Sequence, residues 1–301
     1  MRNNRSDLPD LTYFLVVAKH QNFRQAGVEL GITASAVSHA IKGLEGRLGV
    51  RLLNRTNRSV TLTVAGEELR RDLEEPFGAI GHAMERLNLH RDAPTGHIRL
   101  NVLVGAADLL LAPVLPEFIR RYPDITVELS VTNQMLDVVG EGFDAGIRFG
   151  ATLPADMIAR RLSPDARWIV AGAPDYFAEH GTPKTPHDLK AHRCMQIRLG
   201  NQTLYRWEFE QDGKDLEIDV SGPIILDEGA TALKLALQGA GLIYMTEWDV
   251  KRHVDEGHLV TVLDDWSASG EGFHIYYPSR RQVPNGVRLL VDLIRELRPL
   301  G

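Results

Sequence analysis

Four polar side chains, Ser35, Ser38, His39 and Lys42, recur at steps of three, one and three along one short stretch of the chain. Hydroxyl, imidazole and ammonium groups donate hydrogen bonds, and such donors suit base edges and phosphate oxygens. On a helix these spacings place the four residues along one face, and no carboxylate interrupts the row. We therefore expect a helix that lies in the major groove of double-stranded DNA.

Two short helices must position this row. Asn22 is suited to cap a helix over residues 23–30, and Gly31 ends it. The second helix begins at Thr33 or Ser35, which are both capping residues. Its inward positions follow at steps of four, three and four: Val37, Ile41, Leu44 and Leu48. The pattern predicts a helix-turn-helix unit.

A basic hairpin follows the second helix. Gly49 ends the helix, and residues 51–63 alternate like two short strands around a turn at residues 56–58, with Arg51, Arg55 and Arg58 expected to be exposed. Such arginines would contact phosphates or the neighbouring minor groove. The alternative is an ordinary helical hairpin in a larger core, which the joint occurrence of turn, polar face and basic hairpin disfavours. The predicted DNA-binding residues are Asn22, Arg24, Thr33, Ser35, Ser38, His39, Lys42, Arg55, Thr56 and Arg58.

The charge of the chain is divided in the same way. Residues 1–66 hold nine of the 34 Lys and Arg residues and four of the 40 Asp and Glu residues, a balance of +5. The remaining 25 basic and 36 acidic residues give residues 67–301 a balance of -11. Only the N-terminal segment is therefore expected to bind a polyanion.

Residues 67–92 follow as an amphipathic helix. Its apolar residues recur at steps of four and three: Leu69, Leu73, Phe77, Ile80, Met84 and Leu87. A helix of this kind is expected to bury its apolar face. It would do so either against a second copy of the chain or against its own domain. Pro76 removes one backbone hydrogen bond, so we expect a kink there.

The segment from Leu11 to Leu69, with the signature SAVSHAIKGLEGRLGVRLLNRTNRSVTLTVAGEEL, resembles the winged helix-turn-helix of the LysR-type transcriptional regulators. The resemblance covers essentially the whole chain. It implies a linker helix that pairs two subunits on an inverted-repeat operator, and a periplasmic-binding-protein-like domain whose small-molecule effector modulates sequence-specific DNA binding. The expected partners are double-stranded DNA and a second copy, as a homodimer or homotetramer, with RNA polymerase as a further candidate.

Behind the linker, strands and helices alternate as in an α/β fold. We expect strands at residues 97–104, 125–131 and 144–149, and helices at 106–122 and 134–140. A second α/β lobe begins near residue 164, and a last strand and helix return to the first lobe. The predicted domains are a winged helix-turn-helix at 1–66, the linker helix at 67–92, and an effector-binding domain at 93–301. Its first lobe takes about 93–163 and 268–301, and its second about 164–267.

A ligand in such a sheet lies at the carboxyl ends of the strands. The first strand-to-helix turn offers backbone donors at Gly105 and Ala106, although it lacks the hydroxyl side chain that the family often places there. Arg148, before Phe149 and Gly150, would either hold a carboxylate or close a structural ion pair with Asp144 or a neighbour. The opposite wall is expected to contain Gln196, Arg198, Asp227, Glu228 and Tyr244.

Other classes of protein are less well supported. The chain has no G-x-S-x-G elbow, P-loop or H-E-x-x-H motif, so we predict no enzyme, no catalytic residue and no cofactor. A metal site is a further alternative, with His187, His192 and Cys194 as candidate ligands, but their spacing matches no standard zinc module. The single cysteine is expected to be a buried structural thiol rather than a redox switch. The N-terminus lacks a signal-peptide core, which disfavours a stand-alone solute-binding protein and predicts a cytoplasmic location, and no segment is expected to cross a membrane.

Overall fold

The computed structural model describes residues 7–55, 60–87, 94–138, 140–154, 157–200, 202–278 and 283–301. The chain divides into two compact units, Met1–Met84 and Glu85–Gly301, and each is described by itself. None of the helices in the described ranges combines the length and the apolar character that crossing a bilayer requires.

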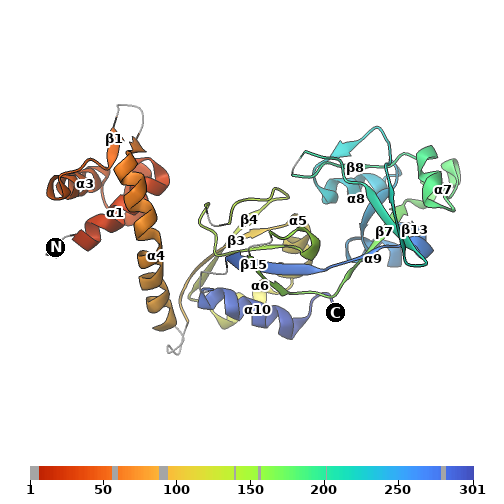
Figure 1. The fold of residues 1–301 in the computed structure, drawn as a ribbon. Coiled ribbons are helices and arrows are strands. Elements are labelled where there is room, and N and C mark those ends of the chain that lie inside the picture. Colours follow the sequence, from red (N-terminus) through yellow and green to blue (C-terminus); the bar gives the residue numbers. More distant parts are fainter. Residues whose placement is uncertain are drawn as a thin grey trace. The chain divides into compact units, whose positions relative to one another are not determined.

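The N-terminal unit is the predicted winged helix-turn-helix, and Figure 1 shows α1, α3 and β1 gathered at the beginning of α4. Its elements are α1 (Asp7–His20), α2 (Phe23–Leu30), α3 (Ala34–Leu48), β1 (Leu53–Arg55), β2 (Val60–Leu62) and α4 (Val64–Leu87). The buried core draws on α1, α2, α3 and β1 through Phe14, Val17, Ala26, Val37, Ile41, Leu44 and Leu53. The inward positions Val37, Ile41 and Leu44 are therefore confirmed, whereas the predicted inward position of Leu48 is wrong, because its side chain is exposed.

Local hydrogen bonds explain why the two short helices begin and end where the sequence predicts. The Asn22 Oδ1 atom accepts from the backbone N–H of Arg24 at 2.8 Å, and the Thr33 hydroxyl accepts from that of Ala36 at 3.2 Å. The helices end at Gly31 and Gly49, whose φ angles of 66° and 70° are strained for any residue with a side chain.

The linker helix α4 begins at Val64, three residues before the predicted boundary. The hydroxyl of Thr63 accepts from the backbone N–H of Gly66 at 3.0 Å, which caps the first turn. The helix is continuous to Leu87 with Pro76 inside it. The kink at Pro76 stays a prediction.

The first lobe of the C-terminal unit is built on a five-stranded sheet in the order β4-β3-β5-β15-β6. β3 runs parallel to β4 and β5, and β15 runs antiparallel to β5 and β6. The elements are β3 (Gly96–Val102), α5 (Val104–Ala106), α6 (Leu115–Arg121), β4 (Ile125–Val131), β5 (Ala145–Phe149), β6 (Met157–Arg161), β15 (Phe273–Pro278) and α10 (Asn285–Leu297). Figure 1 shows α10 beside this sheet, where Val287, Leu290 and Ile294 enter the core.

The second lobe contains a four-stranded sheet in which β7 pairs antiparallel with β12, β13 and β14. Its strands are β7 (Ala166–Gly172), β8 (Gln196–Ile197), β9 (Trp207–Gln211), β10 (Lys214–Ile218), β11 (Ile225–Leu226), β12 (Ile243–Thr246), β13 (Val260–Val262) and β14 (Ser269–Gly270). Its helices are α7 (Pro174–His180), α8 (Gly229–Leu237) and α9 (Glu247–Asp255). As expected, the chain returns to the first lobe with β15 and α10.

Two predicted helices of the first lobe are wrong in part or whole. The helix expected at 106–122 is divided into α5, a π-helical turn at Ala107–Leu111, and α6. Pro113 explains the break before α6, because proline lacks the N–H that a continuous helix needs, and Pro116 lies in the first turn of α6, where that N–H is not required. The helix expected at 134–140 is absent from the described part of that segment, which forms bends and turns.

The two crossovers between the lobes run in contact. The hydroxyl of Ser163 accepts from the backbone N–H of Phe273 at 2.8 Å, and the N–H of Leu162 donates to the carbonyl of Phe273, also at 2.8 Å. A Cβ atom on Gly272 would overlap the carbonyl oxygen of Pro164. Glycine is therefore needed where the second crossover passes the first.

Candidate functional site

The outer face of α3 carries three of the four polar residues with which the row was defined. Ser35, His39 and Lys42 are exposed, whereas Val37 and Ile41 on the other side are fully buried. Ser38 is half-buried and its hydroxyl accepts from Nη1 of Arg55 at 3.1 Å. The exposed donors thus form a helix face that can enter a groove of DNA, and Ser38 lies at the edge of this face.

Arg55 lies partly inside the N-terminal unit, and the expectation that it is exposed is wrong. Its guanidinium carbon lies 5.1 Å from the ring centroid of Phe23, and Nη2 donates to Oε2 of Glu45 at 3.0 Å. Oε1 of Glu45 accepts from the backbone N–H groups of Leu52 and Leu53 at 2.9 and 3.1 Å. Glu45 and Arg55 therefore fasten the first strand of the hairpin to α3.

Helix N-termini provide further donors in this unit. Arg24, in the first turn of α2, has an exposed side chain. Asn22 and Thr33, predicted to bind DNA, act as the caps of α2 and α3 and are exposed at those ends. The free N–H groups and the dipole of a helix N-terminus favour a phosphate. Thr56 and Arg58 lie outside the described residues.

Arg148 is buried in the first lobe, with 3% of its surface exposed. Nη2 donates to Oδ1 of Asn101 at 2.6 Å and to the carbonyls of Gln134 and Thr132 at 2.8 and 3.2 Å. Nη1 donates to the carbonyls of Ile147 and Asn101 at 2.8 and 3.4 Å. Burial lowers the pKa of the Arg148 guanidinium, because its charge has left water. One charged group thus joins β3, β5 and the loop after β4.

The ion pair with Asp144, one of the two alternatives that the sequence left open for Arg148, is replaced by these bonds to neutral oxygens. The carboxylate of Asp144 accepts instead from the backbone N–H of Arg99 at 2.8 Å. Asn101, which is fully buried and holds Arg148, was missed by the sequence analysis. The sequence around Asn101 did not predict this role, because the hydrogen bond joins Asn101 to Arg148, which lies 47 positions later in the chain.

The loop that Arg148 holds also touches the second lobe. Nδ2 of Asn133 donates to the carbonyl of Asp227 at 2.7 Å. A Cβ atom on Gly200 would lie 3.2 Å from the carbonyl oxygen of Asn133, so the two lobes approach closely there. The side chain of Asp227 is exposed beside this contact. The loop after β4 thus contacts both Arg148, at the carboxyl end of β5, and the second lobe.

Several residues predicted on the opposite wall have internal roles. The Glu228 carboxylate caps α8 by accepting from the N–H groups of Ala230 and Thr231, both at 2.8 Å. Tyr244 is 6% exposed in the core of the second lobe, and its hydroxyl donates to the carbonyl of Glu208. Its placement on a cleft wall is therefore corrected.

The remaining predicted residues divide between the lobes. Nε2 of Gln196 donates to the carbonyl of Val220 at 2.8 Å, and Nη1 of Arg198 donates to that of Gln202 at 2.9 Å. In the first lobe, Gly105, Phe149 and Gly150 are half-buried, whereas Ala106 is fully buried.

An aromatic series crosses from one lobe to the other. Phe149 and Phe273 of the first lobe stack at 4.4 Å between ring centroids. Trp168 lies 5.4 Å from Phe149 on one side and 5.4 Å from Tyr244 on the other. Trp248 of α9 lies 6.0 Å from Phe273. A change in the angle between the lobes must therefore move tryptophan rings against their neighbours.

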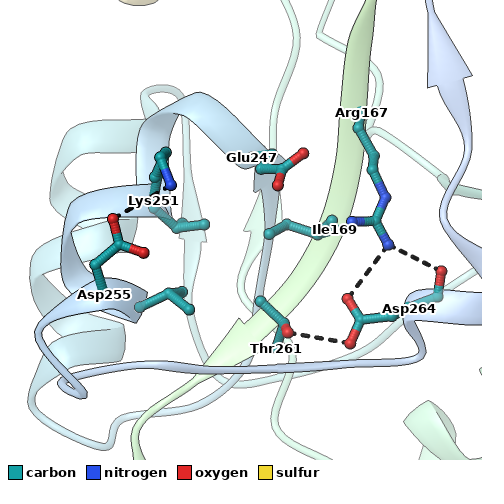
Figure 2. A pocket seen from close by; sticks show the side chains of 9 residues that line it. Arg167, Ile169, Glu247, Lys251, Asp255, Thr261 and Asp264 are labelled. Atoms are coloured by element: carbon teal, nitrogen blue, oxygen red, sulfur yellow. Dashed lines mark hydrogen bonds and ion pairs between the residues drawn. The ribbon is translucent and has the colours of Figure 1, made fainter.

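A cavity of about 110 Å³ lies in the second lobe between α9, β7 and β13 (Figure 2). Four of its five charged groups form two ion pairs, Arg167 with Asp264 at 3.5 Å and Lys251 with Asp255 at 3.3 Å, and Glu247 is the fifth. Its lining includes none of the predicted effector-binding residues. We therefore do not place the effector there.

The metal alternative at His187, His192 and Cys194 finds no support. Nδ1 of His192 lies 3.3 Å from the Tyr176 hydroxyl, and the Cys194 thiol donates to the carbonyl of Leu189. Cys194 is 1% exposed, and burial raises its pKa to about 12. It is the buried thiol that the sequence analysis expects.

Comparisons with known proteins cover both units. Residues 8–67 match the bacterial regulatory helix-turn-helix protein, lysR family, and residues 91–299 match the LysR substrate binding domain. Two regulators of Escherichia coli (strain K12) are similar: YcaN, an HTH-type transcriptional regulator, is 42% identical over 97% of this chain and 95% of its own. PgrR, also an HTH-type transcriptional regulator, is 34% identical over 97% of this chain and 98% of its own. The solved structure of CrgA, a LysR-type transcriptional regulator from Neisseria meningitidis, aligns with a TM-score of 0.62 and 28% identity, covering 96% of this chain and 98% of CrgA.

Proposed function

Because this chain belongs to the LysR family of bacterial transcriptional regulators, we propose that α3 reads its operator and that an effector between the two lobes controls this reading. The chain is a transcriptional regulator with a helix-turn-helix DNA-binding domain and a substrate-binding effector domain. We assign it no catalytic role. We further propose a cytoplasmic location, because its target is DNA.

The exposed face of α3 carries the proposal. Ser35, His39 and Lys42 stand outward from a helix whose opposite face is fully buried, so their donors are available to DNA. The acidic residue nearest to them along α3, Glu45, is engaged with Arg55 and the hairpin backbone. Ser35 and His39 contact base edges in this proposal, and Lys42 contacts a phosphate. Arg24 and the capped N-termini of α2 and α3 contact the flanking backbone.

A gel-shift titration tests these roles. The full-length protein is titrated against the intergenic DNA beside its own gene and against unrelated DNA, at several salt concentrations. Lys42→Ala should weaken binding to both DNAs and reduce the slope of log K against log salt by about 1. His39→Ala should instead reduce the preference for the operator. Lys190→Ala, an exposed lysine of the second lobe, is the matched control.

Two results would contradict the assignment to α3. One is specific binding whose salt slope and affinity are unchanged by Lys42→Ala. The other is a sequence preference unchanged by His39→Ala together with Ser35→Ala. If the wild type binds no operator in a genome-wide selection, the DNA-reading proposal itself fails.

We place the effector at the carboxyl ends of β3 and β5, opposite the second lobe. Gly105, Phe149 and Gly150 belong to the first wall, and Asp227 to the second. The Asp227 carboxylate favours a ligand with hydroxyl or amino groups. Asp227→Asn should weaken the effector's influence on DNA binding, whereas the exposed Asp215→Asn on β10 should not. An equal response of both variants would remove Asp227 from the site.

Self-association completes the proposal. An inverted-repeat operator has two-fold symmetry, so a homodimer or homotetramer would present two copies of α3 at matching half-sites. The paired element is α4, whose sequence carries apolar residues at helical spacing. RNA polymerase is a further proposed partner at the promoter. Analytical ultracentrifugation distinguishes a dimer or tetramer from a monomer, and a monomer at micromolar concentration would contradict pairing through α4.

A further inference from the structure

The end of α9 and the turn after it gather two histidines and a glutamate. Among the described residues, His253, Glu256 and His258 bring one ligand atom each to within 4.8 Å of the others. None of the three is a residue of the DNA-reading face or of the proposed effector site. We propose that they form a site for a divalent transition-metal ion.

Backbone hydrogen bonds hold the three residues in one arrangement. The N–H groups of His258 and Leu259 both donate to the carbonyl of His253, at 2.8 and 3.1 Å. Gly257 between the ligands has a φ of 75°, which allows the chain to reverse there. The spacing of the ligands is therefore set by the end of the helix and not by a loosely held loop.

The Glu256 carboxylate is already oriented for coordination. Nε of Arg252 donates to Oε1 at 2.9 Å, which leaves Oε2 turned toward Nδ1 of His258 at 3.3 Å. A partner that fixes the outer oxygen of a ligating carboxylate is common around metal sites. The negative end of the α9 dipole adds a field that favours a cation.

His253 supplies an independent observation. Its Nδ1 atom is buried and has no hydrogen-bond partner among the described residues. A buried ring nitrogen without a partner is costly, and coordination to a metal ion would satisfy it. The ring of His258 lies 6.3 Å from that of His253, so the two imidazoles stand beside the same space.

Two imidazole nitrogens and one carboxylate oxygen favour Zn²⁺ and its first-row neighbours over Mg²⁺ and Ca²⁺, which prefer oxygen ligands. In a tetrahedral site with bonds of about 2.0 Å, ligand atoms lie roughly 3.3 Å apart. The side chains of His258 and Glu256 are 62% and 40% exposed, so they can rotate inward to reach that distance. Water would take the fourth position. The ion would fasten α9 to the turn before β13.

Calorimetric titration of ZnCl₂ into the chelator-stripped, tag-free full-length protein tests the site. We expect one Zn²⁺ per chain and no heat with MgCl₂. His258→Ala and Glu256→Gln change exposed side chains, so these variants should fold normally. Each should weaken Zn²⁺ binding by more than about 100-fold, because losing even an outer partner of a ligand costs 10–100-fold. His187→Ala, an exposed histidine elsewhere in the second lobe, is the matched control and should bind normally.

A thermal melt gives a second measurement. One equivalent of Zn²⁺ should raise the Tm of the wild type and of His187→Ala, but not that of His258→Ala, because ligation stabilises only the folded state. The proposal is overturned if the wild type binds no Zn²⁺, or if His258→Ala binds Zn²⁺ as well as His187→Ala does. The latter result would mean that the remaining histidines bind the ion without a built site.

Discussion

Replacing Arg148 by methionine should destabilise the C-terminal unit by about 3 kcal/mol. Methionine keeps a long, flexible side chain of comparable length but donates no hydrogen bond. The three shortest bonds of Arg148, at 2.6, 2.8 and 2.8 Å, would be lost. At about 2 kcal/mol for each bond from a charged donor they contribute about 6 kcal/mol. Burying the guanidinium offsets about half of that.

The assay is thermal unfolding of the full-length protein followed by far-UV circular dichroism. For a domain of about 200 residues, each kcal/mol shifts the Tm by about 2–4 °C, so we expect the unfolding transition of this unit to move down by about 6–12 °C. Arg160→Met is the matched control, because Arg160 is an exposed arginine on β6 of the same sheet. It should change the Tm by no more than about 2 °C.

An Arg148→Met variant that melts with the Arg160→Met control would refute this reasoning. It would mean that the five neutral oxygens are as well satisfied without the guanidinium as with it. If that stable variant also failed to respond to the effector, Arg148 would be a ligand-binding residue instead. That is the other alternative drawn from the sequence.

Three further predictions concern single side chains. Glu45→Ala should destabilise the N-terminal unit by about 2 kcal/mol in thermal melts, since two backbone N–H groups and Arg55 lose their acceptor, whereas the exposed Glu68→Ala should not. Cys194, with its pKa raised to about 12 from 9.0, should react with a thiol reagent about 1000-fold more slowly at pH 8 than in the unfolded chain, and rapid labelling of native protein would contradict its burial. The bond from Thr231 lowers the pKa of the Glu228 carboxyl from 4.5, so its contribution to stability is present above pH 4.5 and lost as pH falls through the lower folded-state pKa. Acid melts of Glu228→Gln should lack this loss, while Glu210→Gln should behave as wild type.

Local signals explain why the N-terminal unit could be predicted nearly to the residue. Asn22 and Gly31 each bond to backbone groups within four residues of themselves, so these two residue types suffice to predict where α2 begins and ends. The apolar steps at Val37, Ile41 and Leu44 follow the helix period for the same reason. Glu45 was overlooked because the backbone N–H groups that donate to its carboxylate, those of Leu52 and Leu53, approach α3 only after folding.

The effector domain shows where local signals stop. Strands β3, β4 and β5 were predicted from the alternation of strand and helix patterns along the chain, but β6 and α9 were not predicted. The segment at 134–140 reads as helical, yet its carbonyl at Gln134 accepts from Arg148, and bends replace the helix. A distant side chain there overrides weak local propensity. The histidine cluster was missed for a related reason, because its ligands come together only at the end of the unpredicted α9.

The sequence by itself determined the order of the domains and the buried and exposed faces of α3, because caps, periodicity and charge act over a few neighbouring residues, and its resemblance to known regulators gave the family. Only the tertiary structure decided that Arg55 is held inward by Glu45, that Arg148 binds neutral carbonyls and not a carboxylate, and that Tyr244 lies in a core. Each of these outcomes depends on which groups from distant parts of the sequence pack against the side chain, and on how much water remains around it. Both are properties of the packed chain.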